Sequence, residues 1–254
     1  IARGVATVSY NGTYALQATT SSYFSANNIR SATTDGNGNF WAAGATTGIA
    51  YLGSGTPAAV STNSLNNRLL QDIGGNLYFT TGSGTSRGIY EVSGTPTTPE
   101  VGPVNVVNII DTSVLGSVSP YGFAFNSSMT VAYIADSDAY TSASGFGGIE
   151  KWTFNGTSWA FQYSLPTDGV GANGLAVNFN GTDPVIYATS ADGTSLFDIT
   201  DTGSGSTDTL LDTAGSDEAF RGLTFAPQAV PEPASLALLA VGGAYLFSRR
   251  NRKA

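Results

Sequence analysis

The sequence contains no cysteine and no histidine among its 254 residues. Without cysteine, the chain has no disulfide, no thiol nucleophile and no thiolate metal ligand. Without histidine, it lacks Ser-His-Asp and Cys-His catalysis, imidazole metal sites and the usual general base near neutral pH. Any chemistry would depend on carboxylates, tyrosine, Lys151, arginine or a bound hard cation. These absences favour a protein that is not an enzyme.

Charged residues are scarce, at 11% of the chain, and the two signs are unevenly distributed. Residues 1–229 hold six basic and 17 acidic side chains, whereas residues 230–254 hold four basic and one acidic. The phosphates of a nucleic acid would repel so acidic a body, so we expect no nucleic acid partner. A negative net charge of this size keeps an exported protein soluble.

Long helical patterns are also missing before the C-terminal region. The chain has instead 32 Gly, 13 Phe and 12 Tyr, a composition typical of many short strands joined by tight turns. We therefore expect an all-β domain over residues 1–227. A separate C-terminal region follows over residues 228–254.

This C-terminal region has three parts in a fixed order. The motif Val230-Pro231-Glu232-Pro233 comes first, an apolar run from Ala234 to Ser248 follows, and the basic end consists of Arg249, Arg250, Arg252 and Lys253. A helix over the apolar run would rise about 22 Å, short of the ~30 Å hydrocarbon core of a bilayer. We therefore expect a short apolar helix that stays only temporarily in the membrane, with its basic end in the cytoplasm. The prolines keep the chain extended, as a membrane-embedded protease would require.

At these residues the chain resembles the PEP-CTERM sorting signal of Gram-negative bacteria. In that family the membrane transpeptidase exosortase recognises the tail and removes it near the Pro-Glu-Pro motif, and many members belong to exopolysaccharide and biofilm producers. The resemblance implies exosortase as a processing partner, transient insertion into the inner membrane, and a final location at the cell surface or in the extracellular matrix. The alternative is an ordinary tail anchor that is never cut, which the short span disfavours.

Four segments of the all-β region repeat one pattern: an apolar strand, a turn, a strand around an aromatic residue, a Gly-rich turn and a third strand. Their central aromatic residues are Trp41, Tyr78, Tyr133 and Tyr187. Repeats of this length with three or four strands are typical of β-propeller blades. One blade cannot bury both faces of its small sheet, so blades pack side by side.

The two ends of this region resemble parts of a blade. Residues 5–18 are similar to the third and fourth strands that begin at Ile149, and Phe220–Phe225 is similar to a first strand. We therefore expect about 4.5 blades, with an N-terminal part missing that would complete a propeller of six or seven blades. The body resembles secreted bacterial propellers that carry the same tail and, more loosely, NHL-type blades. That resemblance implies fold and location but no chemistry.

One position stands out when the first strands are aligned. We call it the column, and it consists of Arg30, Arg68, Tyr121, Asn173 and Arg221. Equivalent positions of repeated blades are related by rotation, so we expect these side chains to meet on one face near the axis. Clustered guanidinium groups bind carboxylate, sulfate or uronate in a bidentate manner, which predicts an anionic exopolysaccharide or a surface protein as partner. The alternative is that each arginine pairs with an acidic residue of a neighbouring blade.

Two carboxylate pairs, Asp136 with Asp138 and Asp217 with Glu218, have the oxygen ligands that calcium prefers. Solvation of loops explains them equally well, so we expect no resident metal or cofactor and keep calcium as an alternative. The alternative function is a calcium-dependent propeller enzyme of lactonase or lyase type. Such an enzyme should place acidic residues and asparagine where the column places arginine, tyrosine and asparagine.

Overall fold

The computed structural model describes residues 1–61, 66–98, 106–167 and 169–227. The described residues form 18 β-strands and one short 3-10 helix, η1 (Thr112–Leu115). Residues 1–7 and 15–225 make one compact unit, whereas Val8–Tyr14 group with the end of the chain in a second one. The four four-stranded sheets and the cavity described below lie in the first unit.

Four four-stranded antiparallel sheets follow one another along the chain, each made of consecutive strands. The first sheet consists of β3 (Ile29–Thr34), β4 (Phe40–Gly44), β5 (Ile49–Tyr51) and β6 (Ala58–Ser61). The second consists of β7 (Asn67–Ile73), β8 (Asn76–Ser83), β9 (Ser86–Val92) and β10 (Val106–Asp111). The third consists of β11 (Pro120–Phe125), β12 (Val131–Asp136), β13 (Gly148–Phe154) and β14 (Trp159–Leu165). The fourth consists of β15 (Ala172–Asn178), β16 (Val185–Ser190), β17 (Ser195–Thr200) and β18 (Thr209–Thr213).

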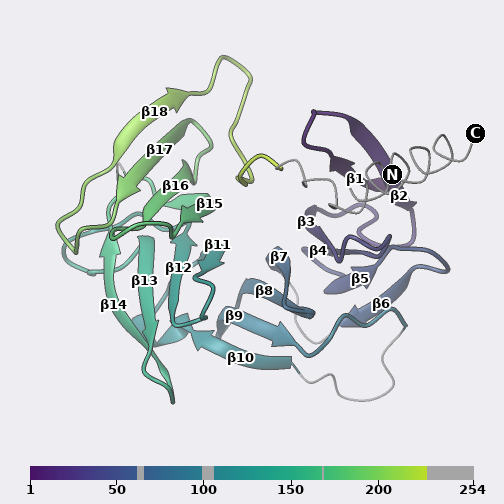
Figure 1. Cartoon of the computed structure of the whole chain (residues 1–254), viewed down its shortest axis with the longest axis horizontal. Coiled ribbons are helices and arrows are strands. Elements are labelled where there is room, and N and C mark those ends of the chain that lie inside the picture. The colour runs from purple at the N-terminus through teal and green to yellow at the C-terminus, as the bar shows by residue number, and fades with distance from the viewer. Residues whose placement is uncertain (62–65, 99–105, 168, 228–254) are drawn as a thin grey trace, which may run out of the picture. The chain divides into compact units, whose positions relative to one another are not determined.

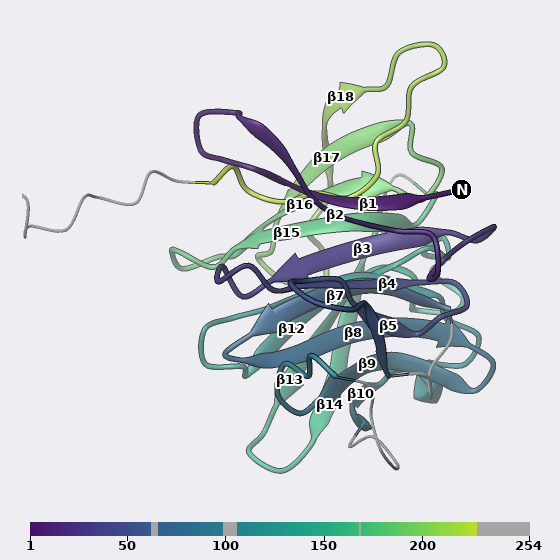
Figure 2. The same cartoon turned by 90° about the vertical axis from the view of Figure 1, so that its right-hand side faces the viewer.

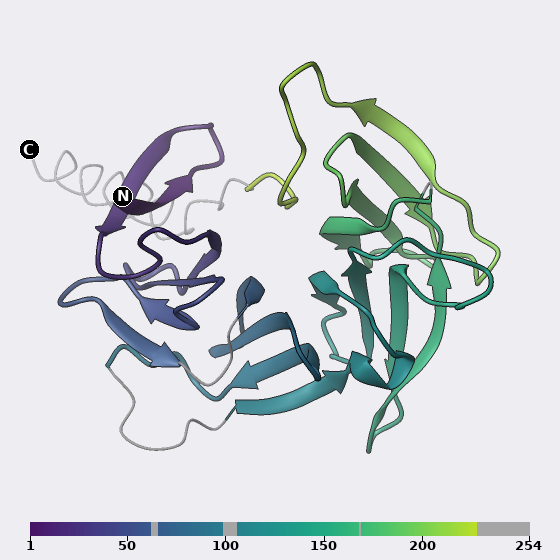
Figure 3. The ribbon, with the colours of Figure 1, turned by 180° about the vertical axis from the view of Figure 1, so that it is seen from behind.

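These sheets have the arrangement of four propeller blades. Figure 1 shows them in chain order, with the first strand of each blade on the inner side and the fourth on the outer side. The view from behind in Figure 3 shows the same order. Figure 2, turned by 90°, shows β3, β4 and β5 beside one another from a second direction. The all-β propeller expected from the repeats is confirmed, and each repeat has a fourth strand besides the three that the sequence pattern defines.

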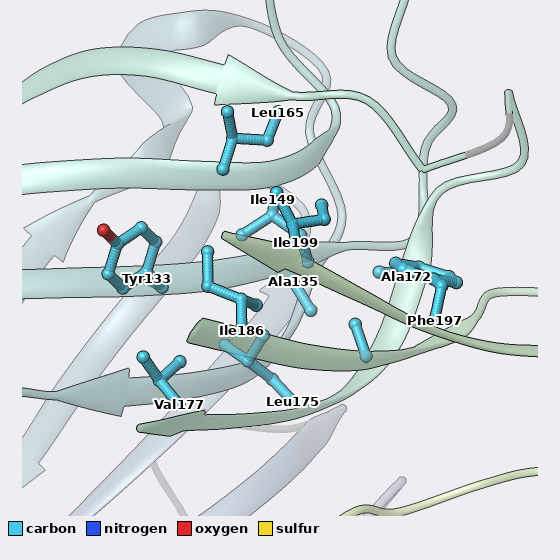
Figure 4. Close-up of a cluster of buried hydrophobic side chains, with 11 residues drawn as sticks. Tyr133, Ala135, Ile149, Leu165, Ala172, Leu175, Val177, Ile186, Phe197 and Ile199 are labelled. Atoms are coloured by element: carbon cyan, nitrogen blue, oxygen red, sulfur yellow. The ribbon is translucent and has the colours of Figure 1, made fainter. Parts of the chain in front are cut away.

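Apolar side chains between neighbouring blades form the core. The cluster between the third and fourth blades, drawn in Figure 4, includes Tyr133, Ile149, Ile186 and Phe197, all of which are buried. Similar clusters lie between the other neighbouring blades. Because each blade covers one face of the next, no blade has to bury its core alone.

The repeat aromatics occupy these interfaces to different extents. Trp41, Tyr78 and Tyr133 are buried, and the Trp41 indole Nε1 donates a hydrogen bond to the Pro96 carbonyl oxygen at 2.6 Å. Tyr187 is only half-buried and meets the ring of Phe225 edge-on. Burial therefore decreases at the last blade, which has no full blade beyond it among the described residues.

The two ends of the body differ from the complete blades. β1 (Arg3–Val8) and β2 (Tyr14–Thr20) form a separate two-stranded sheet, as expected for part of a blade. The predicted first strand Phe220–Phe225 is not a strand, because none of its residues joins a ladder in the described structure. It is held by single hydrogen bonds instead. The Phe220 N–H donates to the Gly193 carbonyl oxygen at 2.8 Å, and the Thr189 hydroxyl donates to the Arg221 carbonyl oxygen at 2.8 Å.

The predicted sorting motif Val230–Pro233, the apolar run Ala234–Ser248 and the basic end lie outside the described residues. Within the described ranges, the structure has no helix that is long and apolar enough to cross a bilayer.

Candidate functional site

The five column residues line a single cavity of about 420 Å³. Arg30, Arg68, Tyr121 and Asn173 come from the first strand of each blade in turn, and Arg221 comes from the segment after the fourth blade. The predicted site residues are thus brought together, with one contributed by each successive repeat. Their shared position follows from the rotation that relates the blades.

Two of the column arginines reach toward the start of the next blade. Arg30 Nη1 donates to Asn66 Oδ1 at 2.5 Å and to the Asn67 carbonyl oxygen at 3.4 Å. Arg68 Nη1 donates to the Ser119 carbonyl oxygen and Oγ, both at 2.8 Å, and to the Pro120 carbonyl oxygen at 3.0 Å. Every one of these acceptors is neutral, so the hydrogen bonds position the guanidinium groups without neutralising them.

The column arginines have no carboxylate partner in the part of the chain that the structure describes, where one ion pair occurs and joins Lys151 to Asp201. The alternative in which each arginine pairs with an acidic residue of a neighbouring blade is therefore not found here. The column retains a positive charge that faces the cavity.

The surroundings of the Arg68 guanidinium disfavour its positive charge. Burial lowers its pKa, the positive charge of Arg30 lowers it further, and Tyr121, Asp136 and Asp138 act in the opposite direction. Its Cζ lies 5.2 Å from the centre of the Tyr121 ring, a cation–π contact. An anion in the cavity would relieve the repulsion between the two cations.

Two threonine hydroxyl groups, which the sequence analysis did not identify, join a column segment of one blade to the next column residue along the chain. Thr80 Oγ1 accepts from the Leu69 N–H at 3.1 Å and donates to the Tyr121 carbonyl oxygen at 2.5 Å. Thr189 Oγ1 accepts from the Gly174 N–H at 2.8 Å and donates in the same way to Arg221. Arg221 thus occupies the position of the next first strand although it is not in a ladder.

Gly174 makes this contact possible because a Cβ there would lie 2.4 Å from the Arg221 carbonyl oxygen. We expect Gly174→Ala to displace Phe220–Phe225 and to speed trypsin cleavage after Arg221 about tenfold or more, since local opening governs such cleavage. The measurement is the cleavage rate followed by mass spectrometry. Gly205→Ala is the control, because a Cβ there would meet no heavy atom within 4 Å. Equal rates in both variants would contradict the proposed role of Gly174.

A second polar cluster, which the sequence analysis did not identify, links the third blade to the fourth. Asp201 follows β17, and its Oδ2 accepts from Lys151 Nζ at 2.8 Å and from the Tyr133 hydroxyl. Its Oδ1 accepts from the Tyr163 hydroxyl at 2.7 Å and the Gly203 N–H at 3.0 Å. The Asp201 side chain is fully buried, and these four donors satisfy it. This cluster is therefore a contact between blades with no acceptor left for a ligand.

The predicted carboxylate pairs are arranged differently from the expectation. Asp138 is exposed, and its N–H donates to Asp136 Oδ1 at 2.9 Å, whereas Asp136 is completely buried. Asp217 and Glu218 are both exposed. Across the described residues, no group of three or more acidic side chains gathers as a metal cluster.

Comparison with known families identifies the C-terminal region. Residues 229–253 match the model of the PEP-CTERM protein-sorting motif. The chain therefore carries the signal recognised by exosortase, and it is a secreted protein that is transiently anchored in the membrane before cleavage. This agrees with the resemblance drawn from Val230–Pro233 and the residues that follow.

Solved structures with a similar fold were found for this chain. A gluconolactonase from Xanthomonas campestris matches with 14% identity and a TM-score of 0.51, over 74% of this chain and 62% of that one. The hydrazine synthase of Kuenenia stuttgartiensis matches with 13% identity and a TM-score of 0.45, over 72% of this chain and 49% of that one. The chain thus spans less than two thirds of either protein, and at 14% identity the likeness to the gluconolactonase concerns the fold alone. No curated protein matches the sequence.

Proposed function

We propose that this protein is a noncatalytic binding propeller that captures an anionic glycan at the column cavity, on the surface or in the extracellular matrix of a Gram-negative bacterium. The observation that carries the proposal is that Arg30, Arg68 and Arg221 line one cavity and have no carboxylate partner among the described residues. A guanidinium presents paired N–H donors that match a carboxylate or sulfate oxygen pair. Uronic acids and sulfated sugars carry these groups, and an exopolysaccharide presents them repeatedly along a chain.

The neutral members of the column suit a sugar as well. Tyr121 offers an aromatic ring at the cavity, and the Asn173 amide is oriented by the Ser137 hydroxyl at 2.6 Å and the Ala191 carbonyl oxygen at 2.9 Å. The alternative of a calcium-dependent lactonase or lyase would need acidic ligands at this place, but the described lining of the cavity contains arginine and asparagine and no acidic residue.

The test is a glycan-array screen of the protein, run beside an Arg30→Ala/Arg221→Ala double variant. We expect acidic glycans to bind, and each lost guanidinium to weaken binding roughly tenfold, since hydrogen bonds to charged groups contribute about 1.5–3 kcal/mol. Binding should also weaken as salt is added.

Arg87→Ala is the control for loss of one positive charge outside the cavity lining, where the Arg87 guanidinium donates to the carbonyl oxygens of Gly84 and Val118. If the double variant binds acidic glycans as well as the unmodified protein, the column is not the binding site. Binding of neutral glycans alone would reject the proposed ligand class.

A further inference from the structure

Two buried carboxyl groups lie on one face of the third blade, and neither forms an ion pair among the described residues. Asp136 and Glu150 are 0% and 1% exposed. Asp136 on β12 pairs with Gly148 on β13, and Ile134 pairs with Glu150, so the two acids are diagonal neighbours on one face of the sheet. The two carboxyl groups are within hydrogen-bonding reach of each other. Two like charges in such a place are unfavourable unless something neutralises them.

In each carboxyl group, one oxygen accepts hydrogen bonds from the described residues and the other accepts none. Asp136 Oδ1 accepts from the Ser119 N–H at 2.8 Å and the Asp138 N–H at 2.9 Å, and Glu150 Oε2 accepts from the Trp152 indole at 3.1 Å. Asp136 Oδ2 and Glu150 Oε1 are buried and have no donor in the described structure. Carboxylates that bind metals are commonly oriented by hydrogen bonds of this kind to their other oxygen.

Two hydroxyl groups near the acids also lack partners. Ser164 on β14 is directly opposite Glu150 in the ladder and is 4% exposed, and its Oγ has no hydrogen-bond partner in the described structure. Thr167 is 0% exposed, its Oγ1 is likewise unpartnered, and it lies 3.3 Å from the place of a Cβ on Gly148, the residue opposite Asp136. Buried polar atoms are rarely left unpaired, so four of them at one end of a blade call for an explanation.

We propose that Asp136 and Glu150 bind a Ca²⁺ ion inside the third blade, with the hydroxyl groups of Ser164 and Thr167 completing an all-oxygen set of ligands. The ion's charge of +2 balances two carboxylates, and hard oxygen donors are what calcium prefers. A single proton shared between the acids would satisfy one pair of oxygens and leave both hydroxyl groups unpaired. The site is separate from the column cavity, whose lining includes none of these four residues.

Burial disfavours the charged forms of the two acids, so a bound ion would have to displace a proton from the pair. Burial raises the pKa of both carboxyl groups, and the charge of Asp136 raises that of Glu150 further. Arg68 forms no ion pair with Asp136 among the described residues, because its guanidinium bonds to Ser119 and Pro120. Calcium sites in extracellular modules have dissociation constants on the order of 0.1–1 mM, which suits an exported protein.

Terbium(III), which replaces calcium at oxygen sites, gives a direct probe because the Trp152 indole bonds to one of the proposed ligands. We expect terbium emission on tryptophan excitation, competition by Ca²⁺, and a rise in Tm of about 3 °C when Ca²⁺ is added to the metal-free full-length chain. Glu150→Gln should weaken terbium binding at least tenfold and remove the calcium-dependent rise in Tm. Trp152→Phe should lower the emission and, because it removes the hydrogen bond that orients Glu150, should also reduce the calcium-dependent rise in Tm.

Asp183→Asn is the matched control, because Asp183 is exposed and lies just before β16 in the fourth blade, outside the proposed site. This variant should behave as the unmodified protein does. The proposal is overturned if the unmodified chain shows neither sensitised emission nor a calcium-dependent change in Tm, which would leave a shared proton as the explanation. It is equally overturned if Glu150→Gln and Asp136→Asn, both folded by circular dichroism, bind terbium with unchanged affinity.

Discussion

Replacing Asp201 with alanine is expected to lower the free energy of unfolding by roughly 3–5 kcal/mol, the usual cost of removing one partner from a buried ion pair. The change leaves the Lys151 ammonium and the hydroxyl groups of Tyr133 and Tyr163 without their common acceptor. Urea titration followed by circular dichroism measures the loss.

Asp183→Ala is the control, because Asp183 is an exposed aspartate just before β16 in the same blade. Asp183→Ala should leave the free energy of unfolding nearly unchanged. A loss of less than about 1 kcal/mol for Asp201→Ala would mean that the cluster behaves as an exposed ion pair does.

The same cluster gives the stability a defined pH dependence. Burial raises the pKa of Asp201, but hydrogen bonds from Lys151, Tyr133 and Tyr163 outweigh it and the net pKa is lowered. A lowered pKa means that this stabilisation is fully present above the unfolded value of about 3.9 and is lost as the pH falls through the folded value. The difference in stability between the unmodified protein and Asp201→Ala should therefore shrink only in strong acid.

Changing Pro231-Glu232-Pro233 to three alanines is expected to abolish processing of the tail in a host that contains exosortase. The unmodified protein should then be recovered from the cell surface with a C-terminus near the motif, because residues 229–253 form the matched sorting motif. The variant should remain in the membrane fraction and end at Ala254. Intact mass spectrometry of both fractions measures the outcome.

The control for this experiment keeps the motif and changes the linker before it, for example Gln228→Ala. It should be processed as the unmodified chain is. Surface-extracted protein that still ends at Ala254 would show that the tail is a permanent anchor.

The sequence was sufficient to predict the blades, and the same alignment picks out the residues that line the cavity, because both follow from equivalent positions in a repeat. That the column binds a ligand stays a prediction. Trp41, Tyr78, Tyr133 and Tyr187 all lie in the second strand of a blade. The same alignment could have shown Thr80 and Thr189, each two residues after such an aromatic residue. The threonine contact was missed because its partner belongs to the next blade.

Contacts between blades could not be predicted in this way. Lys151 and Asp201 are 50 residues apart, and they meet only because of how two twisted sheets pack. Asp136 was paired with Asp138 because the two are close in sequence. The chain leaves the strand after Asp136, so Asp138 faces solvent and the side chain beside Asp136 is Glu150 from the neighbouring strand.

The cavity draws one residue from each successive repeat, and this has a consequence for how the protein can evolve. A change at Asn173 alters one part of the cavity wall and leaves the other column side chains in place, whereas a change at Tyr121 also alters the ring beside Arg68. Ligand preference can therefore change through single substitutions that are nearly independent of one another, provided that the sites do not touch. A lineage exposed to a different polymer could adapt this surface one blade at a time, without having to redesign the fold.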